Sequence, residues 1–579
     1  MSGAEQTVNS KAIMAPTKKA PVFIAITISL AVMAWFLLSR LSFVPVPWPD
    51  GSAFYLPSVE WLSWPPKWKM HSQAAFVPSY DAANFNMMPM VPSFLGIGVK
   101  LGLSKVFGIA LAIRVVSLSV LIVWSWLLWI LAGSCLKKMQ RALLLGGVIA
   151  LAGLMDPINR WGTMVVRSET WIGLSWLFIL LLLKKRSEFT NAKEAKIKES
   201  HFLWLISAAL AFAAYCHFEA VLLVPPVAVA LWPWENAGES GKIKSWIKSL
   251  AAVGLCTCLF LLPWFVYVLS NFSLFTLQME TQFYRLASEN TWIENAYSLF
   301  HSLFISLGSP VSWPKFFNLA KVVFWLLLFL LFGRLVFSSA LRVFKKDSAC
   351  GKEFGLNLAA GIAVLGSLYL WFTKPEVWFI TLVHLMLWPW VALAANQYLK
   401  MPHHRVRHLL VLTAIYFFIS LFATFAQQRN IPKSYSWSLY SSWIDCIQGA
   451  INKNNGKKIW QPHVPDVLVE LSEREPTWDL TRALDFSAEG HRAWELTYKV
   501  DAIILSNHFA SVASNDSINV YEGPERESDR ELLGNGVEVP FGPWVRDRFP
   551  VEQPGVWSNY ICHYGPFWAD LTLRKLLLR

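Results

Sequence analysis

Charged side chains are scarce in this sequence. Asp, Glu, Lys and Arg make up 15% of its 579 residues, whereas 55% are hydrophobic and 15% are aromatic. An ordinary soluble domain carries about 25% charged residues. Several separate stretches here approach the roughly 20 apolar residues that cross a bilayer. The composition therefore excludes a soluble protein and predicts a polytopic membrane protein.

Cysteines are also few, seven in all, which excludes a disulfide-built scaffold. Five of them lie in or near predicted spans, and the other two, Cys446 and Cys562, lie in a polar C-terminal region. The sequence leaves open whether these two pair, because pairing needs both proximity and an oxidising compartment. That region also contains no glycine-rich phosphate loop, CxxC pair or HExxH motif, so no motif assigns its role.

The net charge of +13 reflects basic residues that cluster in short segments between apolar runs. Such clusters mark the cytoplasmic side of membrane proteins, so the charge indicates topology rather than nucleic-acid binding. We expect eleven spans with the N-terminus in the cytoplasm. Their approximate positions are 21–43, 106–132, 142–156, 162–186, 202–216, 219–234, 247–269, 318–339, 355–373, 377–396 and a last span ending near residue 425.

The predicted fold class is mainly α, and the chain divides into three parts. Residues 1–20 form a cytoplasmic tail, and residues 21–426 form the transmembrane module, with its first extracytoplasmic loop at 44–104. From about residue 427 the apolar runs stop, and short β-like runs such as Val467–Leu471 and Ala502–Leu505 replace them. We therefore expect an extracytoplasmic α/β domain at 427–579, on a chain that lies in the plasma (inner) membrane.

Ionisable residues gather at the predicted outward ends of the spans, where burying a charge is expensive and a functional site is the first hypothesis. They are Asp50, Asp156, Arg167, Glu169, His217, Glu219 and Lys374. Each has a simpler explanation when taken alone, as a turn residue, an interfacial ion pair, a polar loop residue or a snorkelling lysine. Seven such residues at one predicted depth favour a shared site.

The first outer loop contains the residue on which this hypothesis depends. Pro49 restricts the backbone before Asp50, and Gly51 permits a turn after it, so we expect this carboxylate to be held at the membrane face. A partly desolvated carboxylate can act as a general base.

Short motifs in the first 400 residues resemble those of the C superfamily of glycosyltransferases (GT-C), in particular the group of protein O-mannosyltransferases and the lipid A aminoarabinose transferase. The motifs are Pro49-Asp50 with Phe54-Tyr55, Met87–Ser93 before a span with Arg114, Asp156-Pro157, Gly162 with Arg167-Ser-Glu169, His217, and Lys374-Pro375 before a span with Pro389. Many relatives have two adjacent acidic residues where this chain has Asp50-Gly51. A divalent cation therefore remains an open possibility.

The resemblance implies inverting transfer of a sugar from a polyprenyl-phosphate donor to an acceptor on the outer face. The acceptor would be a glycan, a lipid or a protein. The protein would also contact membrane lipids, and it would bind no nucleic acid. The implied catalytic residues are Asp50, as general base, and Asp156. Arg167, His217 and Lys374 would bind the donor phosphate as fixed cations, and Tyr55, Glu169 and Glu219 would bind substrate.

Two further features of the sequence are left open. The outer loop after the seventh span, with Gln278, Glu280 and Arg285, is a candidate lid, and Arg114 either faces the bundle interior or packs against a neighbouring helix.

Three alternatives remain. A transporter or flippase also has many spans, but it usually shows internal repeats and broken spans, and no repeat is found here. An O-antigen ligase or polymerase often relies on a long loop with Arg and His, for which residues 271–314 offer Arg285 and His301. A non-catalytic membrane subunit would use the external domain to bind a partner.

Overall fold

In the computed structural model, most of the described residues lie in helices. The described ranges are 88–103, 109–134, 139–164, 166–187, 192–234, 241–286, 348–373, 377–399, 411–422 and 444–449, together with six strands between residues 458 and 574 and a few single residues. The predicted first and eighth spans lie outside these ranges almost entirely.

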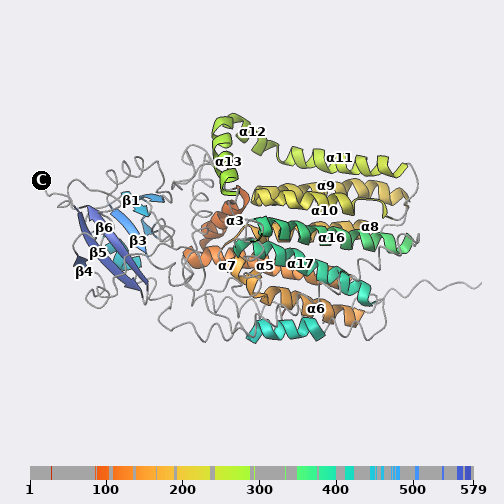
Figure 1. The fold of residues 1–579 in the computed structure, drawn as a ribbon, viewed down its shortest axis with the longest axis horizontal. Helices are drawn as coiled ribbons and strands as arrows, with labels where there is room; N and C mark the ends of the chain where they lie inside the picture. The colour runs from red at the N-terminus through yellow and green to blue at the C-terminus, as the bar shows by residue number, and fades with distance from the viewer. Residues whose placement is uncertain are drawn as a thin grey trace, which may run out of the picture.

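The described helices form an elongated bundle (Figure 1). Their bounds are α3 Met90–Gly98, η2 Val99–Leu103, α5 Ile109–Ser134, α6 Met139–Met155, α7 Pro157–Met164, α8 Glu169–Ser187, α9 Ala192–Cys216, η3 Phe218–Leu223, α10 Val224–Ala230, α11 Gly241–Phe260, α12 Leu262–Ser270, α13 Phe272–Leu286, α16 Ser348–Thr373 and α17 Val377–Leu399. Residues 411–422 form a further helix.

Within the described residues, four helices are long and apolar enough to cross a membrane. They are Ala112–Ala132, Glu199–Cys216, Ile243–Phe260 and Phe354–Thr373. In the third of these, the face toward solvent or lipid is broad, because only 11% of its residues are buried within the protein. These helices support a multi-pass membrane protein, while the number of spans stays a prediction.

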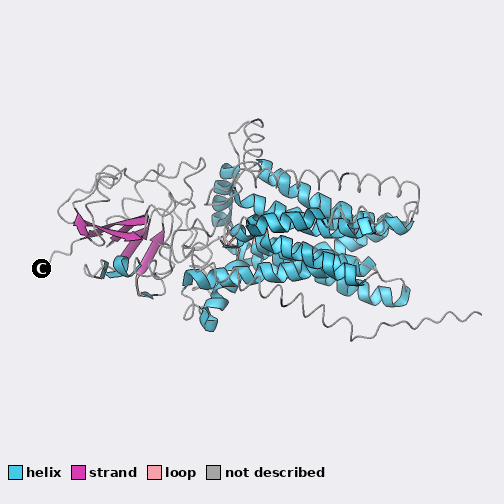
Figure 2. Ribbon diagram, turned by 90° about the horizontal axis from the view of Figure 1, so that it is seen from below, coloured by secondary structure: helices cyan, strands magenta, loops and turns pink. Residues whose placement is uncertain are grey.

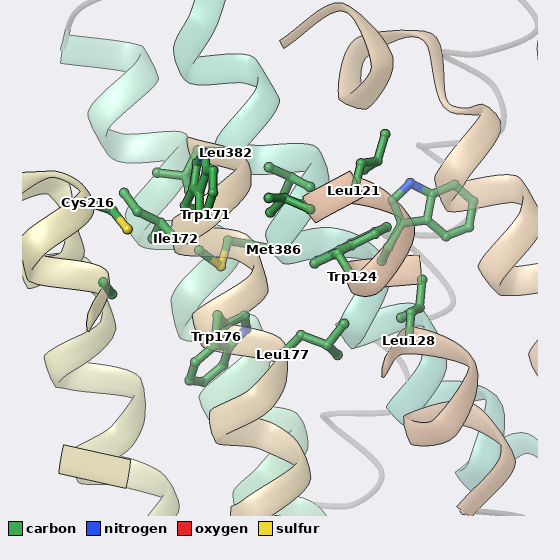
Figure 3. Close-up of a cluster of buried hydrophobic side chains, with 14 of the residues drawn as sticks. Leu121, Trp124, Leu128, Trp171, Ile172, Trp176, Leu177, Cys216, Leu382 and Met386 are labelled. Carbon is green, nitrogen blue, oxygen red and sulfur yellow. The ribbon is translucent and has the colours of Figure 1, made fainter. Parts of the chain in front are cut away.

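The core lies where α5, α8 and α17 meet, as Figure 3 shows. Trp124 on α5, Trp176 on α8 and Met386 on α17 are all at most 1% exposed and belong to one continuous cluster. Close approach of α8 and α17 depends on Gly173, since a Cβ at this position would lie 2.8 Å from Leu385 Cβ. Tight packing here fixes the positions of the helix ends above it.

Two predicted spans are interrupted. The predicted span at 162–186 begins instead at Glu169, because the separate short helix α7 and a turn precede it. The predicted span at 247–269 is divided at Leu261, where Pro263 enters the first turn of α12. Proline cannot donate the backbone hydrogen bond that a continuous helix needs, so α11 and α12 form two helices.

Six strands form one mixed sheet in the order β2-β1-β3-β6-β5-β4. The strands are β1 Lys458–Gln461, β2 Asp479–Arg482, β3 Ala502–Ser506, β4 Val537–Val539, β5 Trp557–Tyr564 and β6 Phe567–Arg574. β1 is parallel to β2 and β3, and the remaining pairs are antiparallel. Figures 1 and 2 show the sheet beyond one end of the helical bundle.

The structure confirms a strand for one of the two β-like runs of the sequence and shows a helical residue at the end of the other. Ala502–Leu505 lies in β3, between β1 and β6. Leu471, the last residue of the other run, is helical and fully buried. An apolar run of this length does not by itself distinguish a strand from a buried helical turn. Cys446, in the same part of the chain, is disulfide-bonded, and its partner's side chain lies outside the described residues.

Candidate functional site

Five of the predicted site residues lie at one end of the bundle, the end that faces the sheet. α7, which follows α6 and precedes α8, is found there (Figure 1). Asp156 lies between α6 and α7, and Arg167 and Glu169 lie at the start of α8. His217 and Glu219 follow α9. All of these residues except His217 are at most 8% exposed, so their charges are removed from bulk solvent.

The first group, which we call the α8–η3 cluster, consists of Arg167, Glu169, His217 and Glu219. Arg167 Nη2 lies 2.8 Å from Glu169 Oε1, and Arg167 Nε lies 3.1 Å from Glu169 Oε2. His217 Nδ1 lies 3.4 Å from Glu219 Oε1. The fork-like contact between Arg167 and Glu169 fixes the guanidinium plane, which a single-point lysine contact would not do.

His217 caps η3 and is held in one tautomer by that role. Its Nδ1 accepts a hydrogen bond from the backbone N–H of Glu219 at 3.4 Å, so the ring hydrogen lies on Nε2. Burial, followed by the nearby charge of Arg167, lowers the pKa of His217 to about 3. The imidazole is therefore neutral near pH 7, and it offers an N–H donor rather than a positive charge.

The turn before α8 positions Arg167 at the cost of backbone strain. The Arg167 N–H donates to Gly162 O and the Val166 N–H donates to Thr163 O, the two hydrogen bonds of a Schellman motif at the end of α7. Val166 occupies the position that usually holds glycine and has φ 60°. A β-branched residue there costs roughly 1–2 kcal/mol, which the burial of the Val166 side chain, 2% exposed, offsets.

Asp156 is the centre of a second group, the α7 cluster, with Arg160, His384, Trp388 and Tyr416. Its Oδ2 lies 2.8 Å from His384 Nδ1 and accepts hydrogen bonds at 3.0 Å from Trp388 Nε1 and Tyr416 Oη. Its Oδ1 accepts from the Ile158 N–H at 3.0 Å and so caps α7. One carboxylate thus ties α7 to α17 and to the helix at 411–422.

Arg160 lies one turn after Asp156 on α7 and is 7% exposed. Burial lowers the pKa of Arg160 to about 10, against the opposing influence of Asp156 and Tyr416. Arg160 therefore stays charged at neutral pH. Within the α7 cluster, Arg160 and Asp156 lie close enough to interact through space.

Three predicted site residues, Asp50, Tyr55 and Lys374, lie outside the described residues. Lys374 directly follows Thr373, the last residue of α16. Of the proposed lid, Gln278 is fully buried and accepts a hydrogen bond from the Phe85 N–H at 3.0 Å, within an aromatic cluster. Glu280 is exposed, and the Arg285 side chain is not described.

The structure bears on two questions that the sequence leaves open, the environment of Arg114 and the presence of a metal site. Arg114 is 3% exposed and so is buried within the bundle. In the described part of the chain, no group of three His, Cys, Asp or Glu side chains could hold a metal ion.

Sequence reasoning missed Arg160, His384, Trp388 and Tyr416. Two of them carried a signal that could have found them. Asp156 and Arg160 are four residues apart, the spacing of an acid and a base on one helix face. His384 is an ionisable residue within an apolar run, which is unusual for a membrane helix. Nothing in the sequence marks Trp388 or Tyr416 among so many aromatic residues.

Comparison with solved structures identifies the fold. The structure is similar to ArnT from Cupriavidus metallidurans in the apo state, with 12% identity, a TM-score of 0.52, and coverage of 86% of this chain and 96% of ArnT. It is similar to the same protein bound to undecaprenyl phosphate, with 10% identity, a TM-score of 0.52, and coverage of 85% and 95%.

No model of a known protein family and no curated protein sequence matches the chain. The likeness is therefore one of fold rather than of sequence. It extends over almost the whole of ArnT, the lipid A aminoarabinose transferase of the GT-C superfamily. The fold comparison agrees with the resemblance that the short motifs indicate: this chain shares the fold of ArnT, which is a member of the GT-C superfamily.

Proposed function

We propose that the protein transfers a sugar from a polyprenyl-phosphate donor to an acceptor on the extracytoplasmic face, with inversion at the anomeric carbon. The observation that carries the proposal is the fold match to ArnT over 96% of its length, including a form bound to undecaprenyl phosphate. The buried α8–η3 cluster, with its fixed guanidinium, supports it independently.

In the proposed reaction, Asp50 accepts the proton of the acceptor hydroxyl as the oxygen attacks the anomeric carbon. The bond between that carbon and the phosphate oxygen breaks, and polyprenyl phosphate leaves with the electron pair. A leaving phosphate is stabilised by fixed donors. Arg167 provides a charge held in place by Glu169, and His217 provides its Nε2–H. Lys374, Tyr55 and Glu219 keep their predicted roles in phosphate and substrate binding.

Asp156 has a supporting role in this proposal. Four donors already surround its carboxylate, so its contribution is to hold α7, and with it the turn that presents Arg167. We place the site, the loop at 44–104 and the region at 427–579 outside the cytoplasm. The disulfide at Cys446 supports this orientation, since structural disulfides persist in oxidising compartments.

A transfer assay separates this proposal from its rivals. Purified protein in lipid nanodiscs is given a panel of undecaprenyl-phosphate sugars labelled in the sugar, together with a cell-envelope extract as the source of acceptors. We expect transfer of label without any ion gradient, because nanodiscs enclose no compartment. Absence of transfer, combined with gradient-driven movement of intact donor in vesicles, would instead support a flippase.

The proposed base is tested in the same assay with Asp50→Asn. We expect a loss of about 100-fold in transfer rate, the low end of what one general base supplies. Asp81→Asn, in the same predicted loop, is the matched control and keeps the wild-type rate. Equal rates for Asp50→Asn and wild type, with equal amounts of inserted protein, would exclude Asp50 as the base.

A further inference from the structure

Arg160 is a buried cation whose guanidinium finds no acceptor among the described residues. The side chain is 7% exposed, and its Nε is fully buried without a hydrogen bond to any part of the chain that the structure describes. Leaving a charged donor unsatisfied in a protein interior is expensive. This arrangement is unusual enough to suggest that a ligand supplies the acceptor.

Asp156 does not fill this role. It is the acidic residue that acts on Arg160 through space. However, its Oδ2 already faces His384, Trp388 and Tyr416, and its Oδ1 caps α7. The carboxylate therefore balances part of the charge without accepting hydrogen bonds from the guanidinium fork.

Arg160 and Arg167 are connected by one short structural unit. Arg160 is the fourth residue of α7, and the Gly162 carbonyl on that helix accepts the hydrogen bond that fixes the Arg167 backbone. Gly162 also allows α7 to approach Thr381 closely, since a Cβ there would lie 2.6 Å from Thr381 Oγ1. The two guanidinium groups are thus carried by a rigid helix and its turn at the same end of the bundle.

The charge of Arg167 is already balanced by Glu169 at 2.8 Å. A leaving polyprenyl phosphate develops a second negative charge, which needs another fixed cation nearby. We propose that Arg160 binds the phosphate group of the polyprenyl carrier as a cation additional to Arg167. This inference rests on the proposed function.

The experiment measures binding of undecaprenyl phosphate to the whole protein in nanodiscs, by the change in intrinsic tryptophan fluorescence or by thermal stabilisation. Undecaprenol and inorganic phosphate are the comparison ligands. The variants are Arg160→Gln, which removes the charge, and Arg160→Lys, which keeps the charge but loses the fork. Arg186→Gln is the matched control, because Arg186 pairs with Glu199 at the opposite end of α8.

We expect Arg160→Gln to bind undecaprenyl phosphate about 10- to 100-fold more weakly than wild type, with undecaprenol binding unchanged. The affinity of Arg160→Lys for undecaprenyl phosphate should lie between those of Arg160→Gln and wild type, and the affinity of Arg186→Gln should equal that of wild type. Wild-type affinity in a folded Arg160→Gln protein would overturn the inference and leave the proposed function intact. Equal Arg160-dependent binding of inorganic phosphate would overturn its assignment to a lipid carrier. If wild type binds undecaprenyl phosphate no better than undecaprenol, the proposed function itself fails.

Discussion

Replacing Asp156 by asparagine tests how the α7 cluster is held together. The carboxylate accepts from the Ile158 N–H through Oδ1 and faces three side-chain donors through Oδ2. An amide has one acceptor oxygen and one donor nitrogen. Whichever way the introduced amide is turned, its NH2 group faces a donor, so the variant cannot satisfy both sides of the cluster.

The magnitude follows from the orientation that keeps more bonds. If the amide oxygen faces His384, Trp388 and Tyr416, the N-terminal cap of α7 is lost, at about 1 kcal/mol. The three remaining bonds lose their charge assistance, at about 1 kcal/mol each. We therefore expect Asp156→Asn to lower the free energy of unfolding by about 4 kcal/mol.

Tyr416→Phe is the matched comparison for Asp156→Asn. It removes one of the four donors with little change in volume and leaves a charged acceptor with the other three, so we expect a loss of only about 1 kcal/mol. Unfolding is followed in mixed micelles as the fraction of SDS rises, with tryptophan fluorescence as the signal. If Asp156→Asn is no less stable than Tyr416→Phe, the structural role of Asp156 is wrong. A stable Asp156→Asn protein that transfers no sugar would return Asp156 to the chemistry.

Two further predictions concern the turn and the histidine beside it. Gly162→Ala places a methyl group against Thr381, and we expect it to lower the free energy of unfolding by about 2 kcal/mol. Adding Thr381→Ala should restore part of this loss. Gly361→Ala is the control that should be tolerated, because its Cβ would lie 3.5 Å from Trp390. A Gly162→Ala protein as stable as Gly361→Ala would contradict the close approach of α7 and α17. Because the pKa of His217 is lowered from 6.5 to about 3, the unfolded chain binds a proton that the folded chain does not, and stability falls as pH drops below about 6.5 toward 3. His217→Asn should reduce this fall and leave stability above pH 7 unchanged, and identical pH profiles for the two proteins would contradict it.

Much of the helical architecture could be predicted because membrane helices depend on length and apolar content alone. The ends of α5 and α17 and the C-terminal end of α16 lie within three residues of the predicted spans for this reason, whereas α16 begins at Ser348, seven residues before its predicted span. The separation of α7 from α8 could not be predicted in the same way. A Schellman motif is normally marked by glycine, and here Val166 occupies that position.

The positions of these candidate residues in the fold were predictable from the sequence, whereas their contact partners were not. The cost of burying charge placed Asp156, Arg167 and His217 at span ends, where the structure has them. Their partners depend on tertiary packing. Asp156 meets His384, 228 residues further along the chain, and no local pattern gives such a contact. The sequence predicted His217 as a cation, and this prediction is wrong. Burial beside Arg167 lowers the pKa of His217 and makes the ring neutral, and the sequence does not show that burial.

The central claim is tested most directly by the rate of sugar transfer from labelled undecaprenyl-phosphate sugar in Arg167→Gln protein. Arg186→Gln, which breaks an ion pair at the other end of the same helix, is measured beside it. We predict a loss of about 100-fold or more for Arg167→Gln, as for removal of one donor to a developing charge, and a wild-type rate for Arg186→Gln. Equal rates for the two variants, or no transfer by the wild-type protein with any donor of the panel, would contradict the account.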